Sequence, residues 1–440
     1  MRSMRLTCSS SVIGLIVTNT VSQGDTRELG LDQLGSYGSK MIRADQNFPW
    51  PGSAVVVVHL LWIAKDTWHG DILLDGRKVP TISPTLEEGF DTHDAVYRLD
   101  QNKNISFKGT TTGCVGFVIE KNERDSLLTQ NPLAIDVIQP FLGGGEFTTV
   151  AILEPQRWVI NFRDWPLERA ETFPECLKVL EDRVKPYFDA RTGQIHEPDY
   201  WKFSDKRLDS YDQIKSLKKV LFHAFTAKYV AFDYVPVGWV YSAPHVVVGL
   251  EDKQFFSVLQ SSIHIEWVHF RCSTIMKSGI RYAPSDLFDT FPFPLSLTSD
   301  WGPQKDVLAE LGERYLQLRN QIRVARNIGL TETYNLFHEN AFEVPDIFQL
   351  RELHRCMDHA VLVFYGWTDL QLEHGFHKTK HGVRYTISEA ARREVLARLL
   401  ALNHQRHAEE EAEQAAQPAA KPAKRGRKPK DTDKQVLMDL

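Results

Sequence analysis

Two apolar runs near the N-terminus restrict the possible fold most strongly. Residues 12–17 read Val-Ile-Gly-Leu-Ile-Val, and a second apolar run covers residues 54–63. Runs rich in β-branched residues without polar alternation are typical of strands covered on both faces, as in α/β sheets. Between the runs, Asp25 and Glu28 have the spacing of a capping box, which predicts a helix that ends near residue 38. The order strand, helix, strand, strand is that of the closing third of a doubly wound sheet.

The composition indicates a globular protein of two or three domains. The chain has 440 residues, of which 42% are hydrophobic and 25% are charged, so a sizeable core is possible. The formal net charge of −5 means that nucleic-acid contacts would depend on local basic clusters. Five scattered cysteines without a CxxC pair fit reduced thiols in the cytoplasm. No apolar run reaches 18 residues, so we expect no transmembrane helix.

Shifts in composition divide the chain into four segments. Residues 1–80 hold the partial sheet, and residues 81–300 mix short strands and short helices in an α+β pattern. We place the end of the second segment at Phe291-Pro292-Phe293-Pro294, because prolines interrupt helices and favour extended backbone. Residues 301–408 have helical periodicity, and residues 409–440 are expected to be a disordered basic tail. The helices expected in the third segment cover residues 303–327, 347–364 and 388–407.

Six separated strings carry a resemblance to a known family. They cover residues 14–28, 157–170, 260–267, 281–294, 333–338 and 357–367. With these strings in this order, the chain resembles the C-terminal half of the large adenine-specific DNA methyltransferases of type IIG restriction–modification and related phage-defence systems. The resemblance implies the C-terminal part of a Rossmann-like class I methyltransferase sheet, then an α+β target-recognition domain that reads DNA, and then a helical region.

The same resemblance implies S-adenosylmethionine as the cofactor of the complete enzyme. Family members methylate adenine N6 with an Asn/Asp-Pro-Pro-aromatic loop, and this tetrapeptide does not occur in the sequence. No βαβ unit with a Gly-rich turn precedes residue 12, and Gly143-Gly144-Gly145 reads as a flexible loop rather than a cofactor turn. We therefore nominate no catalytic residue. We expect this chain alone not to bind S-adenosylmethionine and to need a separate N-terminal half for catalysis.

Two aromatic residues and one loop are the predicted contacts with DNA bases. In the family that the sequence resembles, the region of Phe48 and Trp50 flanks the target-base pocket, so these rings are expected to stack on a flipped adenine. The alternative is a rigid turn with a buried tryptophan. Lys277, Ser278 and Arg281 lie where related proteins vary with their recognition sequence, and arginine pairs well with guanine edges. The alternative for this loop is a solvated surface.

Other basic residues are predicted to contact the DNA backbone. The densest basic stretch of the folded part runs from residue 206 to residue 228, which fits phosphate contacts as well as it fits a solvated helix face. The string Arg425-Gly426-Arg427 resembles an AT-hook, which enters the minor groove, or else is a non-specific basic tail. The residues nominated for these contacts are Lys218, Lys219, Lys228, Arg425 and Arg427.

Three functions are compatible with these patterns. The first is the target-recognition portion of a DNA N6-adenine methyltransferase, and the second is a stand-alone DNA-binding or interaction protein without methyl transfer. The third is a metal-dependent hydrolase that uses the histidines of residues 374–381. We read those histidines as a loop between helices and nominate no metal ligand, because zinc needs three or four converging ligands. An unpaired third of a sheet would expose apolar faces, so we also expect the isolated chain to aggregate.

Overall fold

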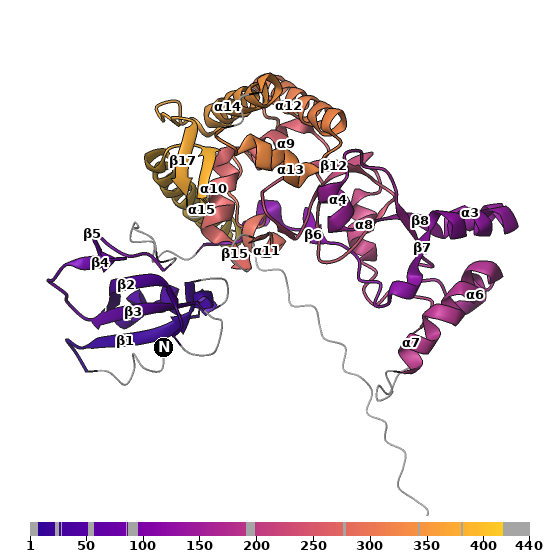
Figure 1. The fold of residues 1–440 in the computed structure, drawn as a ribbon, viewed down its shortest axis with the longest axis horizontal. Coiled ribbons are helices and arrows are strands. Elements are labelled where there is room, and N and C mark those ends of the chain that lie inside the picture. Colours follow the sequence, from indigo (N-terminus) through magenta and orange to yellow (C-terminus); the bar gives the residue numbers. More distant parts are fainter. Residues whose placement is uncertain are drawn as a thin grey trace, which may run out of the picture.

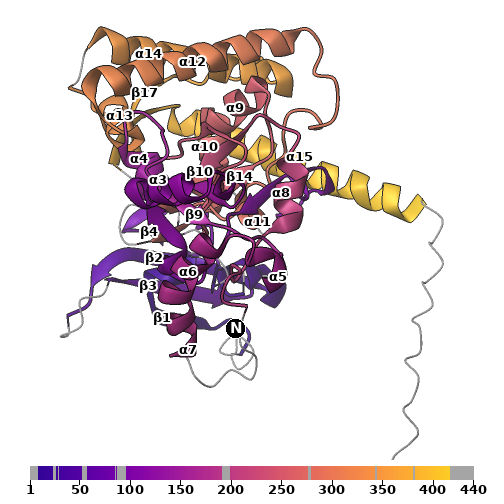
Figure 2. The same ribbon diagram turned by 90° about the vertical axis from the view of Figure 1, so that its right-hand side faces the viewer.

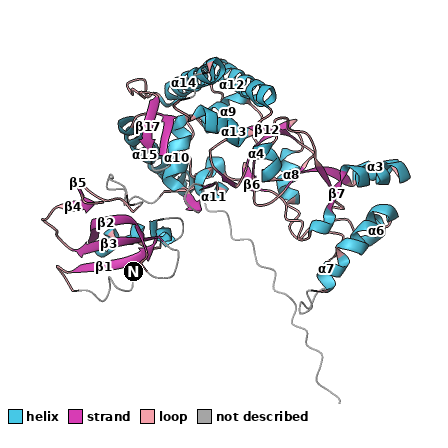
Figure 3. Ribbon diagram, in the orientation of Figure 1, coloured by secondary structure: helices cyan, strands magenta, loops and turns pink. Residues whose placement is uncertain are grey.

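The computed structural model consists of a main body, an N-terminal sheet beside it and a lobe at the opposite end (Figure 1). Each of these parts has a hydrophobic core of its own. Helices and strands alternate through the main body and the lobe, whereas strands dominate the N-terminal sheet (Figure 3). The described residues are 8–22, 26–27, 29–51, 57–84, 86, 96–190, 199–275, 279–341, 344–379 and 382–416.

The N-terminal sheet has the strand order β1-β3-β2-β4-β5. The predicted strand at residues 12–17 is confirmed as β1, and the two strands expected after it are β2 and β3. Strand β3 lies between β1 and β2 and is antiparallel to both, so β1 and β2 run in the same direction. The strand bounds are Val12–Thr18 (β1), Ser39–Pro49 (β2), Val57–Lys65 (β3), Ile72–Leu74 (β4) and Arg77–Val79 (β5).

The prediction that β1 is covered on both faces is wrong. Ile13, Leu15 and Val17 pack against the core of the sheet, but Val12 and Ile16 are 45% and 62% exposed. Successive side chains of a strand point to opposite faces, so an apolar run does not by itself bury both. One face of β1 therefore presents apolar side chains to solvent in the described part of the chain.

The segment between β1 and β2 differs from the predicted helix. Its described part contains three 3-10 turns, η1 (Asn19–Ser22), η2 (Leu31–Gln33) and η3 (Gly35–Tyr37), the last of which ends at Gly38 with a left-handed φ of 62°. Within the predicted range, residues 26–27 are the described residues with helical structure. Asp25 and Glu28, the expected cap, lie outside the described residues. The buried Leu31 and Leu34 fix η2 and η3 against the sheet, so 3-10 turns stand where the second half of the predicted helix was expected.

The lobe is built on a four-stranded sheet with the order β13-β8-β9-β7. Figure 1 shows α3, α6 and α7 of this lobe at the end of the molecule farthest from the N-terminal sheet. Its strands are Val118–Glu120 (β7), Ile138–Leu142 (β8), Arg157–Ile160 (β9) and Val240–Tyr241 (β13). Its helices are Lys121–Gln130 (α3), Leu167–Ala170 (α5), Pro174–Arg183 (α6) and Lys185–Asp189 (α7).

The three glycines at residues 143–145 do not form a flexible loop. Gly143 is the N-cap of the short helix α4 (Gly144–Thr149), and its amide donates to Glu146 Oε2 over 3.1 Å. The Gly144 amide donates to His245 Nε2 over 2.8 Å, and a Cβ atom on Gly144 would lie 2.2 Å from this imidazole ring. Glycine is needed here for the close approach of backbone and ring.

The main body contains two further sheets, with the orders β12-β10-β14-β6 and β11-β16-β15. The strands of the first sheet are Ser106–Lys108 (β6), Lys219–His223 (β10), Asp233–Pro236 (β12) and Val246–Val248 (β14). Those of the second are Thr226–Ala227 (β11), Ser273–Ile275 (β15) and Gly279–Arg281 (β16).

Helices make up most of the rest of the body, and the three predicted after residue 300 are confirmed as α12, α14 and α15. Figure 2 shows α12 and α14 side by side and the end of α15 extending past the body. Since α15 continues to Ala416, residues 409–416 are helical rather than disordered as predicted. The helix bounds are Leu208–Ile214 (α8), Lys253–Gln260 (α9), Ser262–Arg271 (α10), Pro284–Leu287 (α11), Gln304–Arg326 (α12), Leu330–Phe337 (α13), Pro345–Tyr365 (α14) and Glu389–Ala416 (α15).

One continuous core joins the body from Leu142 to Leu400. Phe291 and Phe293, whose Phe-Pro string we expected at a segment boundary, are fully buried in it. The α+β part and the helical part are therefore packed as one unit. Among the described helices, none combines the length and the apolar character needed to cross a membrane.

A carboxylate near this core gives the protein a pH-dependent term in stability. Burial raises the pKa of Asp289 to about 6, against the lowering effect of Arg98 and of the hydrogen bond from Ser106. A raised carboxyl pKa contributes stability below the unfolded pKa near 3.8, and this contribution is lost as pH rises through about 6. We expect Asp289→Asn to stabilise the fold by about 1 kcal/mol at pH 8, since partial exposure screens the effect.

The measurement is a thermal unfolding series between pH 4 and pH 8. The gain from Asp289→Asn should shrink toward pH 4, where the folded carboxyl is already protonated. Asp212→Asn, at an exposed aspartate of α8, is the control and should change little at any pH. A gain from Asp289→Asn that is equal at pH 4 and pH 8 would contradict the assignment.

Candidate nucleic-acid interface

Arg281 lies at the end of the hairpin that carries the predicted base-reading loop. It is the last residue of β16 and is exposed, and its neighbours in the small sheet are Thr226 of β11 and Ser273 of β15. The guanidinium carbon lies 5.1 Å from the centre of the Phe225 ring, and Arg281 has no acidic partner among the described residues. Lys277 and Ser278 lie outside the described residues. The backbone pairs thus hold a cation with unused donors at the surface.

Phe225 brings a second cation to the same place. Lys108, the last residue of β6, has its Nζ atom 5.4 Å from the centre of the Phe225 ring. Arg281 and Lys108 are separated by more than 170 positions in the sequence, so no local pattern could connect them. A cation over an aromatic face is stabilised by the ring quadrupole and keeps its hydrogen-bond donors available.

Lys228 extends this surface along the chain from β11. It is exposed, and its Nζ donates to Asn335 Oδ1 over 2.6 Å, an atom that also accepts from the Tyr229 hydroxyl over 2.9 Å. Strand β11 pairs with β16, the strand that ends at Arg281. Lys228 is the residue directly after β11. We call the set Lys108, Phe225, Lys228 and Arg281 the β11 surface.

Lys218 and Lys219 lie elsewhere. They stand at the start of β10, and β11 follows the end of that strand. At about 3.3 Å per residue, the length of β10 alone separates Lys219 from His223 by roughly 13 Å. Lys219 Nζ lies 4.2 Å from the centre of the Tyr234 ring, and Lys218 is exposed. The structure therefore does not gather the three nominated lysines at one place.

Much of the basic stretch that contains these lysines is neutralised by ion pairs. The Nζ of Lys206 lies 2.6 Å from Asp164 Oδ1. The next two cations of the stretch are also paired, Arg207 with Asp205 over 2.9 Å and Lys215 with Asp212 over 3.2 Å. The phosphate-binding prediction for Lys218, Lys219 and Lys228 stays a prediction, and the geometry favours Lys228. Arg425 and Arg427 lie outside the described residues.

Phe48 and Trp50 stand at the end of β2 and are 47% and 42% exposed. The alternative of a rigid turn with a buried tryptophan is therefore wrong. Two exposed aromatic rings at one strand end have faces available for stacking. Their role as a base platform stays a prediction.

The histidines of residues 374–381 are not arranged as a metal site in the described part of the chain, where no group of three His, Cys, Asp or Glu side chains could hold an ion. His374 instead donates to Asp358 over 2.7 Å, and Asp358 also accepts from the Ser262 amide over 2.8 Å. Burial alone would raise the pKa of Asp358, but His354, His374 and Ser262 together lower it. Asp358 is thus a buried carboxylate fixed between helix α10, helix α14 and the segment after α14.

Ser262, His354 and Asp358 look like a hydrolytic triad in composition but not in geometry. The Ser262 hydroxyl and Asp358 Oδ2 lie 3.1 Å and 3.6 Å from the same nitrogen, His354 Nε2. A triad needs the carboxylate on one ring nitrogen and the nucleophile on the other. This group therefore ties helices together.

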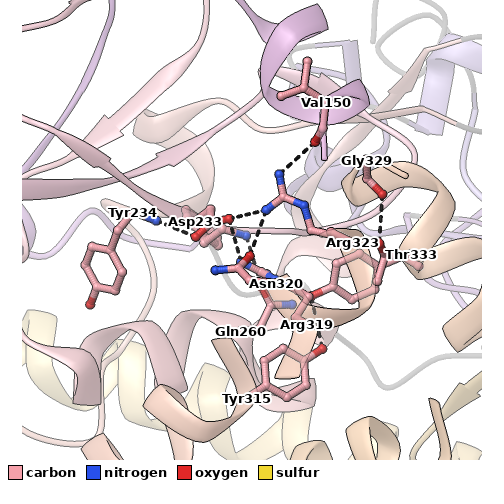
Figure 4. Close-up of polar contacts among 12 residues, drawn as sticks. Val150, Asp233, Tyr234, Gln260, Tyr315, Arg319, Asn320, Arg323, Gly329 and Thr333 are labelled. Carbon is pink, nitrogen blue, oxygen red and sulfur yellow. Dashed lines mark hydrogen bonds and ion pairs between the residues drawn. The ribbon is translucent and has the colours of Figure 1, made fainter. Parts of the chain in front are cut away.

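A second buried polar network joins the strands to the helices (Figure 4). Asp233 Oδ2, at the start of β12, lies 3.1 Å from Arg319 Nη2 and 2.8 Å from Arg323 Nη1, both on α12. Arg323 also donates to the Val150 carbonyl, and Arg319 donates to the Tyr334 hydroxyl. Sequence reasoning did not find this network, since charged residues in a helix are expected on its solvated face.

The segment that carries the β11 surface matches the model of a known protein family. The family model described as "MmeI, target recognition domain" matches residues 98–295. Residues 98–295 are similar to the MmeI target recognition domain. All four residues of the β11 surface lie inside this recognition segment. Comparison with curated proteins found no match.

A solved structure extends the likeness to most of the chain. The type IIL restriction-modification enzyme MmeI, solved in complex with DNA, has a TM-score of 0.65 and 18% sequence identity to this chain. The match covers 90% of this chain and 50% of MmeI, so the chain spans half the length of that protein. The fold of this chain is therefore similar to half of MmeI. The comparisons support a likeness to the target recognition domain of a restriction–modification enzyme, and the adenine-specific type IIG part of the expectation stays a prediction.

Proposed function

We propose that this chain is the target-recognition portion of a site-specific DNA N6-adenine methyltransferase of a restriction–modification or phage-defence system. Its recognition segment would bind double-stranded DNA, with Arg281 reading a base edge. The observation that carries this proposal is an exposed arginine without an acidic partner among the described residues, held by strand pairs inside the segment that matches the MmeI target recognition domain. Arginine on a rigid hairpin suits bidentate binding of guanine O6 and N7.

Methyl transfer is the finer part of the proposal. S-adenosylmethionine would supply the methyl group, and it would be held by protein outside these residues. The described residues do not fit this cofactor at the glycine-rich turn weighed above, because the backbone of Gly144 packs on the His245 ring. The exposed rings of Phe48 and Trp50 would stack on the flipped adenine.

The test is selection of binding sites from a random pool of duplex DNA with the 440-residue chain. We expect one enriched sequence. Methylation of the adenine in that sequence is then assayed with the chain alone and with a candidate N-terminal half. Methylation by the chain alone would contradict the absence of a catalytic centre, and sequence-specific binding without methylation in either assay would favour a DNA-binding protein without methyl transfer.

Arg281→Ala should weaken binding to the selected site by about 5- to 150-fold, which corresponds to 1–3 kcal/mol, and weaken binding to random DNA much less. The reason is that base contacts discriminate between sequences, whereas phosphate contacts do not. Both affinities are measured by fluorescence anisotropy. Arg183→Ala, at an exposed arginine of α6 paired with Glu123, is the control. Equal losses on both DNAs would show that Arg281 contacts only phosphate.

A further inference from the structure

The segment read from the sequence as a loop between helices is a paired β-hairpin with a strongly basic character. Strands β17 (Gly375–Thr379) and β18 (Gly382–Thr386) are antiparallel over five residue pairs. Residues 374–388 contain three histidines, two lysines and one arginine and no aspartate or glutamate. Lys378 is exposed, whereas Lys380 and His381, between the strands, lie outside the described residues. We call residues 375–386 the basic hairpin.

Helix α14 fixes the base of this hairpin. The guanidinium carbon of Arg351 lies 4.8 Å from the centre of the Phe376 ring and 5.5 Å from that of Tyr385. These two rings come from β17 and β18, so a single arginine contacts both strands. Arg351 itself is buried and donates to the Phe337 carbonyl over 2.9 Å. Together with the His374 contact to Asp358, this packing makes the hairpin a fixed projection.

The basic hairpin lies directly against the β11 surface. The guanidinium carbon of Arg384 lies 5.4 Å from the centre of the Tyr229 ring, and Lys228 Nζ lies 5.2 Å from the same ring. Thr379 of the hairpin and Lys228 line one cavity of about 50 Å³. That volume is well below the roughly 300–1,000 Å³ of small-molecule pockets, so the cavity is too small for a nucleotide. Lys228 and Arg384 are therefore placed to bind a partner at the open surface rather than a ligand enclosed in the cavity.

The acid and base groups around this contact leave it positive. Glu266 lines the cavity and is the acidic residue there. His338 also lines it, and burial, followed by the nearby Arg384, lowers its pKa well below the usual value, so the ring is neutral near pH 7. Lys228 and Arg384 thus outnumber the single carboxylate of the cavity wall.

We infer that the basic hairpin, together with Lys228, is a second DNA contact that binds backbone phosphates and positions the duplex against Arg281. The inference rests on the proposed function. Lys228 and Arg384 share the Tyr229 ring, and Lys228 directly follows the strand that pairs with β16, which ends at Arg281. Lys378 is exposed on the opposite face of the hairpin from Arg384. Cations on these adjacent segments suit contacts with a polyanionic backbone. The hairpin lies at residues 375–386, outside the segment 98–295 that the recognition model matches.

The experiment measures binding of the full chain to random duplex DNA over a series of KCl concentrations, and to the selected site. Lys378→Ala and the double variant Lys378→Ala/Arg384→Ala are compared with Lys178→Ala, at a lysine of α6 that is 66% exposed. We expect each hairpin variant to lower its affinity for random DNA and its affinity for the selected site by the same factor. The slope of log affinity against log salt should fall by about 0.9 for each lost phosphate contact. Arg384→Lys should retain most of the binding, because a phosphate contact needs charge.

The outcomes separate this inference from the proposed function. If the unaltered chain binds no duplex DNA, the proposed function fails. If the chain binds its site and Arg281→Ala removes the preference, but the hairpin variants bind both DNAs with unaltered affinity and salt slope, only the hairpin inference fails. A loss confined to the selected site would overturn phosphate binding as the role of the hairpin.

Discussion

Replacing Asp233 with alanine should lower the free energy of unfolding by roughly 3–5 kcal/mol, which for a chain of this length lowers the thermal unfolding temperature by about 3–5 °C. The carboxylate is the shared partner of Arg319 and Arg323, whose side chains are 0% and 3% exposed. Removing the anion leaves two buried guanidinium groups without their counter-charge. Differential scanning calorimetry of the full chain measures the shift.

Asp212→Ala is the matched control, because Asp212 pairs with Lys215 on the surface and is 70% exposed. Its unfolding temperature should stay close to that of the unaltered chain. A triple variant with Leu at Asp233 and Met at both Arg319 and Arg323 should recover part of the loss, since apolar groups of similar volume can replace a buried ion pair. An Asp233→Ala chain that unfolds at the original temperature would mean that the network contributes nothing to stability.

Asp358→Ala should lower both stability and non-specific DNA affinity. The loss of stability should be about 2–4 kcal/mol, because a fully buried carboxylate would no longer accept hydrogen bonds from the Ser262 amide and His374. The second effect follows from the loss of the His374 contact, which holds the base of the basic hairpin on α14. Calorimetry and salt-dependent DNA binding at a temperature where the variant is folded measure the two effects separately.

Asp369→Ala is the control for this variant. Asp369 is 65% exposed and pairs with Arg398, whose hydrogen bond lowers the pKa of the carboxyl to about 2. Removing this surface pair should leave DNA binding unchanged. If Asp358→Ala is less stable but binds DNA with unaltered affinity and salt slope, His374 does not position the hairpin.

Local sequence patterns predicted the helices and strands whose formation depends on their own residues. Helices α12 and α14 follow from apolar periodicity, and the Ser388 hydroxyl caps the start of α15 by accepting from the Ala391 amide over 3.2 Å. The apolar run at β1 predicted a strand but not its exposed face, because coverage depends on what packs against the sheet. Strings of residues along the chain also identified the recognition segment.

Local sequence patterns could not predict contacts between segments that are distant in the sequence. Lys108 reaches the Phe225 ring that Arg281 also contacts, and Arg384 reaches the Tyr229 ring beside Lys228. Nothing near these residues in the sequence indicates either contact. Arg319 and Arg323 read as solvated positions of a helix, although Asp233 draws them into the core. In each case the partner lies at least 80 positions away, where only the fold decides the neighbours.

Asn403 shows that the recognition segment, residues 98–295, packs together with helix α15, which lies outside it. Its side chain, fully buried on α15, donates to the carbonyls of Tyr97 and Thr290, next to the two ends of the segment that matches the recognition model. Residues 98–295 excised alone would lose this clasp, and Phe256 would lose the Tyr315 ring of α12. A chimera that moves the recognition segment into a related protein should therefore include the C-terminal helices that pack against it.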